Sequence, residues 1–349
     1  MPAQMTTGKH TAMWRRLIMG MCFTLVPVAQ ASAYKAYVSN EKSNTISVID
    51  TTAWKVVETI KVGQRPRGIS FTKDQKYVLV AVGDDDTIQM IDTTSNKVVD
   101  SLPSGPDPEL FIDDPTGKIL YVANENDNTV TIIDIERRAR LGEVEVGVEP
   151  EGMGLSPDGK ILVNTSETTN MAHFIDTASH QVVANVLVDA RPRFAQFKDD
   201  GSELWVSSEI GGTVSVIDPI KHEVRTKIAF SVPGMRGEAI QPVGINITRN
   251  GKIGFVALGP ANRIAVVDGT THQVQKYLLV GQRVWHMAFT PDEKYLLNQR
   301  RHERRIGDRR GGAQGHRFHT SRRTALGHHH LATLTSRPST RRAMSEERR

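Results

Sequence analysis

The stretch Asn44-Thr45-Ile46-Ser47-Val48-Ile49-Asp50 decides the fold, because versions of it return along the chain at a nearly fixed spacing. Its aspartate recurs four times at intervals of 42 residues and once more after 50, at Asp92, Asp134, Asp176, Asp218 and Asp268. Alternating β-branched residues before the aspartate predict a strand that ends in an Asx-type turn. A period of about 40 residues with several short strands in each unit is typical of an all-β propeller.

Four strands are predicted in each period. In the unit after Pro108 they are expected at 109–113, 118–124, 129–134 and 140–146. The connections are short and rich in Asp, Asn, Gly and Pro, which favours antiparallel pairing of consecutive strands. We therefore expect a seven-bladed β-propeller of four-stranded blades near 34–62, 67–102, 109–146, 151–188, 193–230, 242–280 and 284–297, the last of them truncated.

The repeat stops after Tyr295-Leu296-Leu297, where an Arg-rich tail, 298–349, begins. One interpretation is a natural disordered basic tail, and the other, which we prefer, is a shifted reading frame near codon 298. Residues 303–317 can be encoded by bases that, read one position later, spell NDVSVIDVAALKVI, which aligns with NTISVIDTTAWKVV at 44–57. The hidden aspartate lies within one residue of position 310, which is 42 after Asp268.

A frame shift at this point has structural consequences. The last blade would lack its third and fourth strands, and the first blade would lack its inner strand. We therefore expect two unpaired strand edges, a ring that is not closed and a disordered tail at 298–349, with lower stability or a tendency to aggregate as the result.

The first 33 residues have the pattern of a secretory signal peptide. Arg15 and Arg16 precede the apolar run 17–28, and Ala31-Ser32-Ala33 provides a small-x-small cleavage pattern. A short N-terminal anchor is the alternative. We expect a periplasmic or secreted protein that does not remain in the membrane after cleavage. The single cysteine, Cys22, lies inside this segment, so the mature chain would have no disulfide and no thiolate metal site.

The charge distribution disfavours a nucleic-acid partner. The net charge is +5, but residues 1–33 contribute +3 and residues 298–349 contribute +10. The repeat region 34–297 therefore carries −8, and it would repel a phosphate backbone.

Several recurring motifs resemble the repeat of YVTN-family β-propellers over residues 34–297: Tyr37-Val38-Ser39-Asn40, Tyr121-Val122-Ala123-Asn124, Val62-Gly63 with Pro66 and Gly68, and Ser156-Pro157-Asp158-Gly159. The signal segment and the 42-residue units are similar in particular to periplasmic YVTN proteins associated with PQQ-dependent alcohol catabolism. This resemblance implies a non-catalytic binding or scaffold protein, with a small ligand or a periplasmic dehydrogenase-type protein as its partner. It supplies no set of catalytic residues and no cofactor.

The loops that lead into the inner strands of a propeller converge on its central channel. The residue after the proline of each first strand is Arg67, Glu109, Glu151 and Arg193 at 42-residue intervals, followed by Val243 and then by Trp285, where the proline is lost. Arg65, Arg191 and Arg283 lie two residues before Arg67, Arg193 and Trp285. Our candidates for binding a small polar or anionic ligand at the channel mouth are Arg65, Arg67, Glu109, Glu151, Arg191, Arg193, Arg283, Trp285 and His286. The alternative is a ring of ion pairs between blades.

His286 occupies the place of Gly68, Gly152 and Gly244, which makes it a weak candidate for a catalytic proton acceptor. With Glu109 or Glu151 it suggests an alternative function, a lactonase-like hydrolase or isomerase. The more ordinary interpretation is that it fills the space near the axis. No metal or cofactor site is predicted, since Asp84-Asp85-Asp86 is typical of a solvated turn and His180, His222 and His272 fall on separate blades.

Overall fold

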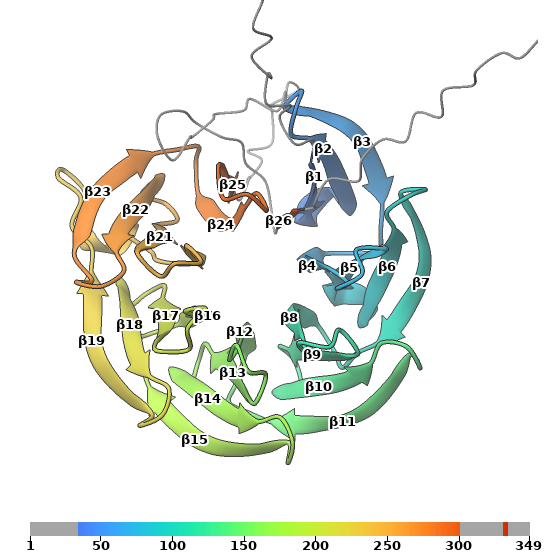
Figure 1. Cartoon of the computed structure of the whole chain (residues 1–349), viewed down its shortest axis with the longest axis horizontal. Helices are drawn as coiled ribbons and strands as arrows, with labels where there is room; N and C mark the ends of the chain where they lie inside the picture. Colours follow the sequence, from blue (N-terminus) through green and yellow to red (C-terminus); the bar gives the residue numbers. More distant parts are fainter. Residues whose placement is uncertain (1–33, 301–330, 334–349) are drawn as a thin grey trace, which may run out of the picture. The chain divides into compact units, whose positions relative to one another are not determined.

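The structure, a computed structural model, describes residues 34–300 and 331–333 (Figure 1). The predicted signal segment at 1–33 and most of the tail lie outside the described residues. Within the described part of the chain, no helix combines the length and apolar character needed to cross a bilayer.

Six antiparallel sheets of four strands follow one another around a central axis (Figure 1). The first sheet comprises β26 (Leu331–Thr333), β1 (Lys35–Asn40), β2 (Thr45–Asp50) and β3 (Lys55–Lys61), and the second comprises β4 (Pro66–Phe71), β5 (Tyr77–Val82), β6 (Thr87–Asp92) and β7 (Lys97–Pro103). The third sheet comprises β8 (Pro108–Asp113), β9 (Ile119–Asn124), β10 (Thr129–Asp134) and β11 (Ala139–Glu145), and the fourth comprises β12 (Pro150–Leu155), β13 (Ile161–Ser166), β14 (Met171–Asp176) and β15 (Gln181–Leu187). The fifth sheet comprises β16 (Pro192–Phe197), β17 (Leu204–Ser208), β18 (Thr213–Asp218) and β19 (Glu223–Ala229), and the sixth comprises β20 (Ile245–Ile247), β21 (Ile253–Ala257), β22 (Arg263–Asp268) and β23 (Val274–Leu279). The predicted all-β propeller with four-stranded blades is confirmed for these six sheets.

A smaller sheet follows the sixth. It has two strands, β24 (Val284–Phe289) and β25 (Leu296–Arg300). Three short 3₁₀ turns complete the described elements: η1 (Glu41–Ser43), η2 (Gly83–Asp85) and η3 (Gly237–Ala239). The eight residues added between Asp218 and Asp268 form a loop around η3.

The recurring aspartates fix the turn between the third and fourth strands. Asp50 Oδ1 accepts hydrogen bonds from the backbone N–H groups of Thr52 and Ala53 at 2.7 and 2.9 Å. Asp218 repeats this pattern in the fifth sheet, with the N–H groups two and three residues on. A carboxylate that accepts hydrogen bonds from two backbone N–H groups of the turn stabilises the turn, which has no regular secondary structure of its own.

In several of these turns one residue then contacts the preceding sheet. Asn96 accepts a hydrogen bond from the Tyr37 hydroxyl at 2.6 Å, and the ring of His222 lies against Phe174 with centroids 4.7 Å apart and the ring planes tilted by 57°. His272 lies beside Trp205 in the same way. These residues occupy the left-handed region of φ, which turns their side chains toward the neighbouring sheet. His222 and His272 therefore hold adjacent sheets together.

Apolar side chains between neighbouring sheets form the cores. Between the second and third sheets, Leu79, Ile88 and Met90 pack against Leu120 and Val122, all of them almost completely buried. Burial of one such side chain contributes about 1.5–3 kcal/mol. Because each sheet exposes two apolar faces, it is stable only with a sheet on either side.

The seam between the first sheet and the two-stranded sheet differs from the prediction. β26 pairs with β1 in the register Ala36↔Thr333 to Val38↔Leu331, so the prediction of an unpaired inner edge is wrong. The physical reason is that the backbone groups of an edge strand need hydrogen-bond partners, and residues 331–333 supply them. Strand structure at 298–300, the end of β25, and at 331–333 also departs from the disordered tail predicted for 298–349.

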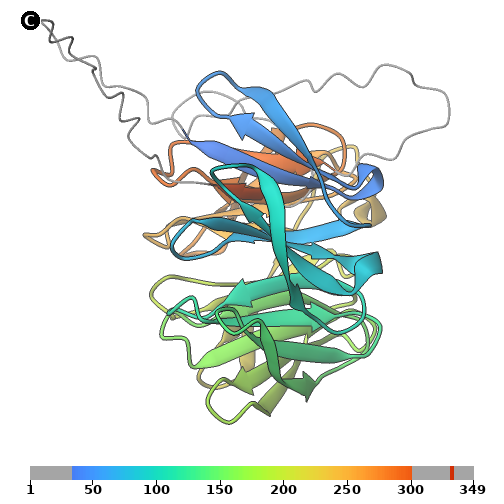
Figure 2. The same cartoon turned by 90° about the vertical axis from the view of Figure 1, so that its right-hand side faces the viewer.

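Side chains also cross this seam, where the sequence predicted an open ring. Trp54 meets Tyr295 edge to face with ring centroids 5.1 Å apart, and Ala36 packs on Leu297. Trp54 holds the same turn position as Asn96 and His222 in the other sheets. Figures 1 and 2 both show the first sheet beside the two-stranded sheet.

Truncation of this seam contact is expected to destabilise the protein. Trp54→Ala should lower the free energy of unfolding by about 1–3 kcal/mol, because it removes an aromatic pair and its buried area. Val57→Ala is the control, since Val57 is 56% exposed in the same sheet. Equilibrium urea unfolding would measure both variants. An equal effect of the two substitutions would show that the seam does not depend on Trp54.

Candidate functional site

The charged residues at the channel are positioned by a repeated backbone arrangement. Arg65, Asp107 and Arg191 each precede the proline of a first strand and adopt positive φ near 55–59°. The N–H of Arg65 donates to Asn44 Oδ1 at 3.1 Å, and that of Arg191 donates to Asn170 Oδ1 at 2.9 Å. The N–H of Asp107 donates to Asp86 Oδ1 at 2.9 Å, so a side-chain oxygen of the preceding sheet holds each of these loops at the channel.

The carbonyl groups of the same residues anchor a second set of positions. The N–H of Glu125 donates to the carbonyl of Asp107 at 2.9 Å, and that of Glu209 donates to the carbonyl of Arg191 at 2.8 Å. Within one sheet, the residue that follows the second strand is therefore brought next to the residue that precedes the proline of the first strand. Two separate stretches of each sheet deliver charged side chains to one place.

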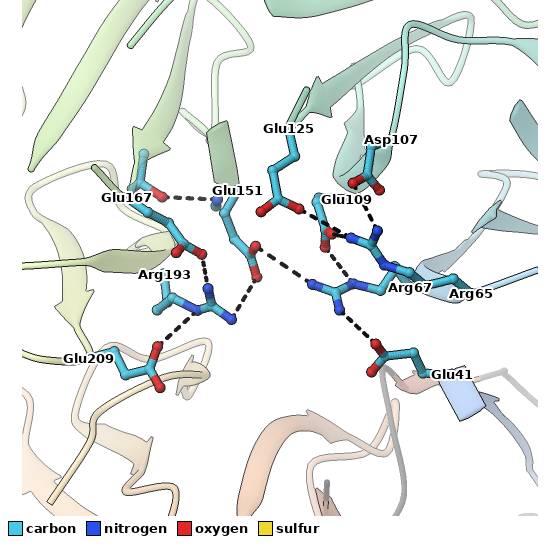
Figure 3. A network of polar contacts seen from close by, with 12 residues as sticks. Glu41, Arg65, Arg67, Asp107, Glu109, Glu125, Glu151, Glu167, Arg193 and Glu209 are labelled. Carbon is cyan, nitrogen blue, oxygen red and sulfur yellow. Dashed lines mark hydrogen bonds and ion pairs between the residues drawn. The ribbon is translucent and has the colours of Figure 1, made fainter. Parts of the chain in front are cut away.

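Arg65 is surrounded by carboxylates of the third sheet (Figure 3). Its Nη1 lies 2.8 Å from Asp107 Oδ2, and its Nη2 lies 2.7 Å from Glu109 Oε1 and 3.2 Å from Glu125 Oε2. Glu109 is completely buried, whereas the Arg65 side chain is 27% exposed. The guanidinium therefore neutralises buried acid in the neighbouring sheet.

Arg67 connects four sheets (Figure 3). Its Nε donates to Glu109 Oε2 at 2.5 Å, its Nη1 donates to Glu41 Oε1 at 3.2 Å, and its Nη2 lies 3.8 Å from Glu151 Oε2. Glu41 belongs to the first sheet, Glu109 to the third and Glu151 to the fourth. Both oxygens of Glu109 are thus engaged, one by Arg65 and one by Arg67.

Arg193 forms the second centre of the network. It contacts Glu167, and it lies 3.5 Å from Glu151 Oε1 and 3.4 Å from Glu209 Oε2. Arg191 joins it through Glu167 at 2.6 Å. The Arg193 side chain is only 4% exposed. Because Arg67 and Arg193 both contact Glu151, the ion pairs form one continuous set along the channel wall from the first sheet to the fifth.

The remaining arc of the channel is aromatic. Trp285 lies between two arginines, with the guanidinium carbons of Arg193 and Arg283 at 5.3 and 5.9 Å from its ring centroid. These are cation–π distances. His286 is buried and lies against Phe194, with centroids 5.4 Å apart and the ring planes tilted by 54°.

The glycines that His286 replaces are required by close packing. A Cβ on Gly68 would lie 2.5 Å from the carbonyl oxygen of Glu109, and one on Gly244 would lie 2.6 Å from that of Trp285. The backbone of the following sheet therefore fits only against glycine. His286 stands in the last sheet of the series.

Burial and charge act against each other in the network. Burial raises the pKa of Glu109 well above its usual range, with Glu151 and Glu125 adding to the effect and Arg67 opposing it. Burial also acts to raise the pKa of Glu151, but Arg193, Arg67 and His286 together lower it. The guanidinium of Arg67 loses solvation on burial, yet Glu109 and Glu151 raise its pKa above the ordinary value. The arginines stay charged because carboxylates surround them.

Acid exceeds base at this site. The four arginines of the network are Arg65, Arg67, Arg191 and Arg193, and they meet eight carboxylates, those of Glu41, Asp84, Asp107, Glu109, Glu125, Glu151, Glu167 and Glu209. The interpretation as ion pairs between blades, which the sequence left open, matches these contacts.

Five carboxylates of the network escaped the sequence analysis: Glu41, Asp107, Glu125, Glu167 and Glu209. Four of them carried a signal, since Glu41, Glu125, Glu167 and Glu209 follow the second strand at multiples of 42 residues, with Gly83 at the remaining position. A search for periodic charge after the second strand would have found them. Only the fold shows that this position meets the residue after the proline.

Three carboxylates in the third sheet could hold a metal ion by spacing alone. Oxygens of Asp107, Glu109 and Glu125 lie within 4.8 Å of one another. Arg65 contacts all three carboxylates. Its guanidinium already supplies the positive charge that a cation would bring, so we assign no metal site here.

Comparison with known proteins supports the fold. Residues 18–137 match the family described as YNCE-like beta-propeller. Among solved structures, a chain of Kuenenia stuttgartiensis Hydrazine Synthase is similar, with a TM-score of 0.70 and 19% identity over 76% of this chain and 88% of that one. At this identity the likeness shows the fold alone. No curated protein sequence is significantly similar to the chain. The protein is a β-propeller.

Removal of one guanidinium from the network is expected to be strongly destabilising. Arg67→Met leaves Glu109 and Glu151 buried without this partner, which should cost about 3–5 kcal/mol in urea unfolding. Lys160→Met is the control, because its ion pair with Asp158 is exposed and should contribute less than about 1 kcal/mol. A double variant Arg67→Met with Glu109→Met should recover part of the loss. Additive effects of the two substitutions would contradict the coupling of Arg67 and Glu109.

Proposed function

We propose that the protein is a non-catalytic binding propeller whose channel face recognises a small polar ligand or a segment of a partner protein. The observation that carries this proposal is the ion-pair network of Figure 3, which joins five sheets and holds its charged groups in place before any ligand arrives. Preorganised polar groups reduce the entropic cost of binding. A catalytic role has less support, because both Glu109 oxygens are engaged by arginines.

The charge balance of the network favours a particular ligand. An anion would have to displace carboxylates that already occupy Arg65, Arg67, Arg191 and Arg193. A ligand that carries positive charge or hydrogen-bond donors would instead meet the excess of carboxylates. We therefore propose a cationic or donor-rich ligand in place of an anionic one.

We further propose that the protein is exported and supports PQQ-dependent alcohol oxidation by binding a dehydrogenase-type partner. The signal-like segment at 1–33 and the resemblance to YVTN-family repeats support this part of the proposal. The acidic channel disfavours binding of PQQ itself, which is an anion. The role would be that of a binding partner, without a cofactor in the propeller.

We also propose that the two-stranded sheet β24–β25 is the first half of a seventh blade. Phe255 of the sixth sheet packs on Phe289, and Trp54 of the first sheet packs on Tyr295. The small sheet therefore has the same neighbours that a complete blade would have.

Titration with ligands of different charge tests the binding proposal. A small quaternary amine should raise the melting temperature in a saturable and salt-sensitive way, whereas neutral alcohols and PQQ should have a smaller effect. Glu125→Gln removes one partly exposed channel carboxylate and should weaken amine binding about 5–10-fold, in line with about 1 kcal/mol. Glu143→Gln, on the exposed outer strand β11, should bind as the unaltered protein does. Stabilisation by PQQ alone would refute the choice of ligand.

The alternative function is a lactonase-like hydrolysis or isomerisation that uses His286. It is favoured by one observation, that His286 is buried next to Trp285, at the position where other units carry a glycine. Turnover of a lactone panel by the unaltered protein, together with at least a 100-fold loss in His286→Ala, would support this function. We expect no turnover by either protein, and Glu143→Gln again serves as the control.

A further inference from the structure

A buried histidine holds the connection between the third and fourth sheets. His173 of β14 is 7% exposed, and its Nε2 accepts a hydrogen bond from the backbone N–H of Gly147 at 3.0 Å. Its Nδ1 lies 2.6 Å from Asn185 Oδ1 on the neighbouring strand β15. A Cβ on Gly147 would lie 2.7 Å from His173 Nε2, so the connection passes close to the ring at a residue without a side chain.

These two contacts determine the protonation state of the ring. A backbone N–H can only donate, so Nε2 of His173 must present a lone pair to Gly147. The proton of the neutral ring therefore lies on Nδ1, which donates it to Asn185 Oδ1. An imidazolium carries a proton on both nitrogens and would place an N–H against the N–H of Gly147. The contact with Gly147 exists only while His173 is neutral.

The second sheet makes the same contact with a group that does not titrate. Gln89 of β6 is the residue two 42-residue periods before His173, and Gly63 is the residue two periods before Gly147. The N–H of Gly63 donates to Gln89 Oε1 at 3.0 Å. The chain therefore contains a version of this contact that does not depend on pH.

The segments of the fourth sheet around His173 direct their charged groups elsewhere. Strands β13 and β15, which flank β14, contain no acidic or basic side chain. In the connection, Glu149 accepts a hydrogen bond from the Thr168 hydroxyl, and Glu167, after β13, is bound by two arginines of the network. Asp176, at the far end of β14, accepts hydrogen bonds from its own turn.

The third sheet faces His173 with apolar side chains. His173 lies on the same side of β14 as Ile175, which packs in one core with Val144 of the third sheet. Tyr121 belongs to this core, and burial raises its pKa, so its hydroxyl stays neutral throughout the acid range. Two acids flank Val144 on β11 and therefore lie on the opposite face of that strand: Glu143 and Glu145.

The connection that His173 holds leads to the centre of the channel network. Glu151 follows Gly147 by four residues. It is the carboxylate that Arg67 and Arg193 both contact, at 3.8 and 3.5 Å. A change in the position of the connection would therefore reach the ion pairs that join the two halves of the network.

We infer that His173 is a positioning residue for the channel site, which holds the connection to Glu151 while it is neutral and releases this connection when it is protonated. The protonated ring has another acceptor beside it. Thr169 Oγ1 is buried without a hydrogen-bond partner among the described residues, and, like His173 Nε2, it would crowd a Cβ on Gly147. The effect on ligand binding rests on the proposed function, whereas the release of the connection does not.

The direction of the pH dependence follows from burial. Burial lowers the pKa of His173, and the hydrogen bond with Asn185 opposes this effect. The folded protein therefore binds this proton less readily than the unfolded chain does. The stabilisation from the contact is complete above about pH 6.5, the ordinary pKa of histidine, and is lost as the pH falls through the pKa of the folded protein.

Hydrogen exchange at the two equivalent connections tests the inference in the full chain. After correction for intrinsic exchange rates, protection of the Gly147 amide should fall about 10-fold between about pH 7.5 and pH 5, as expected for the loss of one hydrogen bond. Protection of the Gly63 amide should not follow this fall, because Gln89 remains an acceptor at both pH values.

His173→Gln is the matched variant, since it copies Gln89. It should keep the Gly147 amide protected at both pH values. An equal fall at Gly147 and Gly63 in the unaltered protein, or the same fall at Gly147 in His173→Gln, would overturn the inference. The comparison of the two amides in the unaltered protein decides the matter even if the variant does not fold.

Binding of a small quaternary amine at the same pH values tests the positioning role. Acidification should weaken binding about 3–10-fold more in the unaltered protein than in His173→Gln, because the two proteins carry the same channel carboxylates. An equal loss in both would overturn the positioning role. Absence of amine binding at every pH would refute the proposed ligand and the positioning role together, while exchange at Gly147 would still show whether His173 holds the connection.

Discussion

Burial of apolar side chains between adjacent sheets is the constraint on which this structure depends. Each sheet has alternating residues on both faces, and neither face can be hidden within the sheet itself. Leu79, Ile88 and Met90 are buried only because Leu120 and Val122 of the next sheet lie against them. The sheets must therefore continue around an axis until the last one meets the first. Stability is a property of the ring more than of any single unit.

The turns and the channel follow from the same requirement. The aspartate turn sends Asn96, His222 or Trp54 toward the preceding sheet, so that each unit contacts its neighbour at the periphery. Glycines such as Gly68 and Gly244 allow the backbones to approach near the axis. Close approach of the inner strands then brings charged residues of different sheets within bonding distance, and Arg67 can reach Glu41, Glu109 and Glu151 at once.

The channel network combines structural and recognition properties. Its arginines are saturated by carboxylates, which makes them poor anion receptors and good connectors between sheets. The excess of acid leaves the channel face negative, with Trp285 on the side where ion pairs are replaced by aromatic contacts. Buried ion pairs are costly to desolvate, so they add more to the geometric definition of the site than to the stability of the fold.

The sequence by itself determined the architecture, because the 42-residue period, the alternation before Asp50 and the turn chemistry are local patterns that each unit repeats. It also identified six charged residues of the network by their place after or near the proline of a first strand: Arg65, Arg67, Glu109, Glu151, Arg191 and Arg193. Two features were decided only by the tertiary structure. The pairing of Arg65 with Glu125 and of Arg193 with Glu209 depends on which loops meet at the axis, and the pairing of β1 with β26 joins segments almost 300 residues apart. The ion pairs arise from the convergence of loops near the axis, within one sheet or between neighbouring sheets, and the strand pairing arises from closure of the ring. Local patterns encode neither of these.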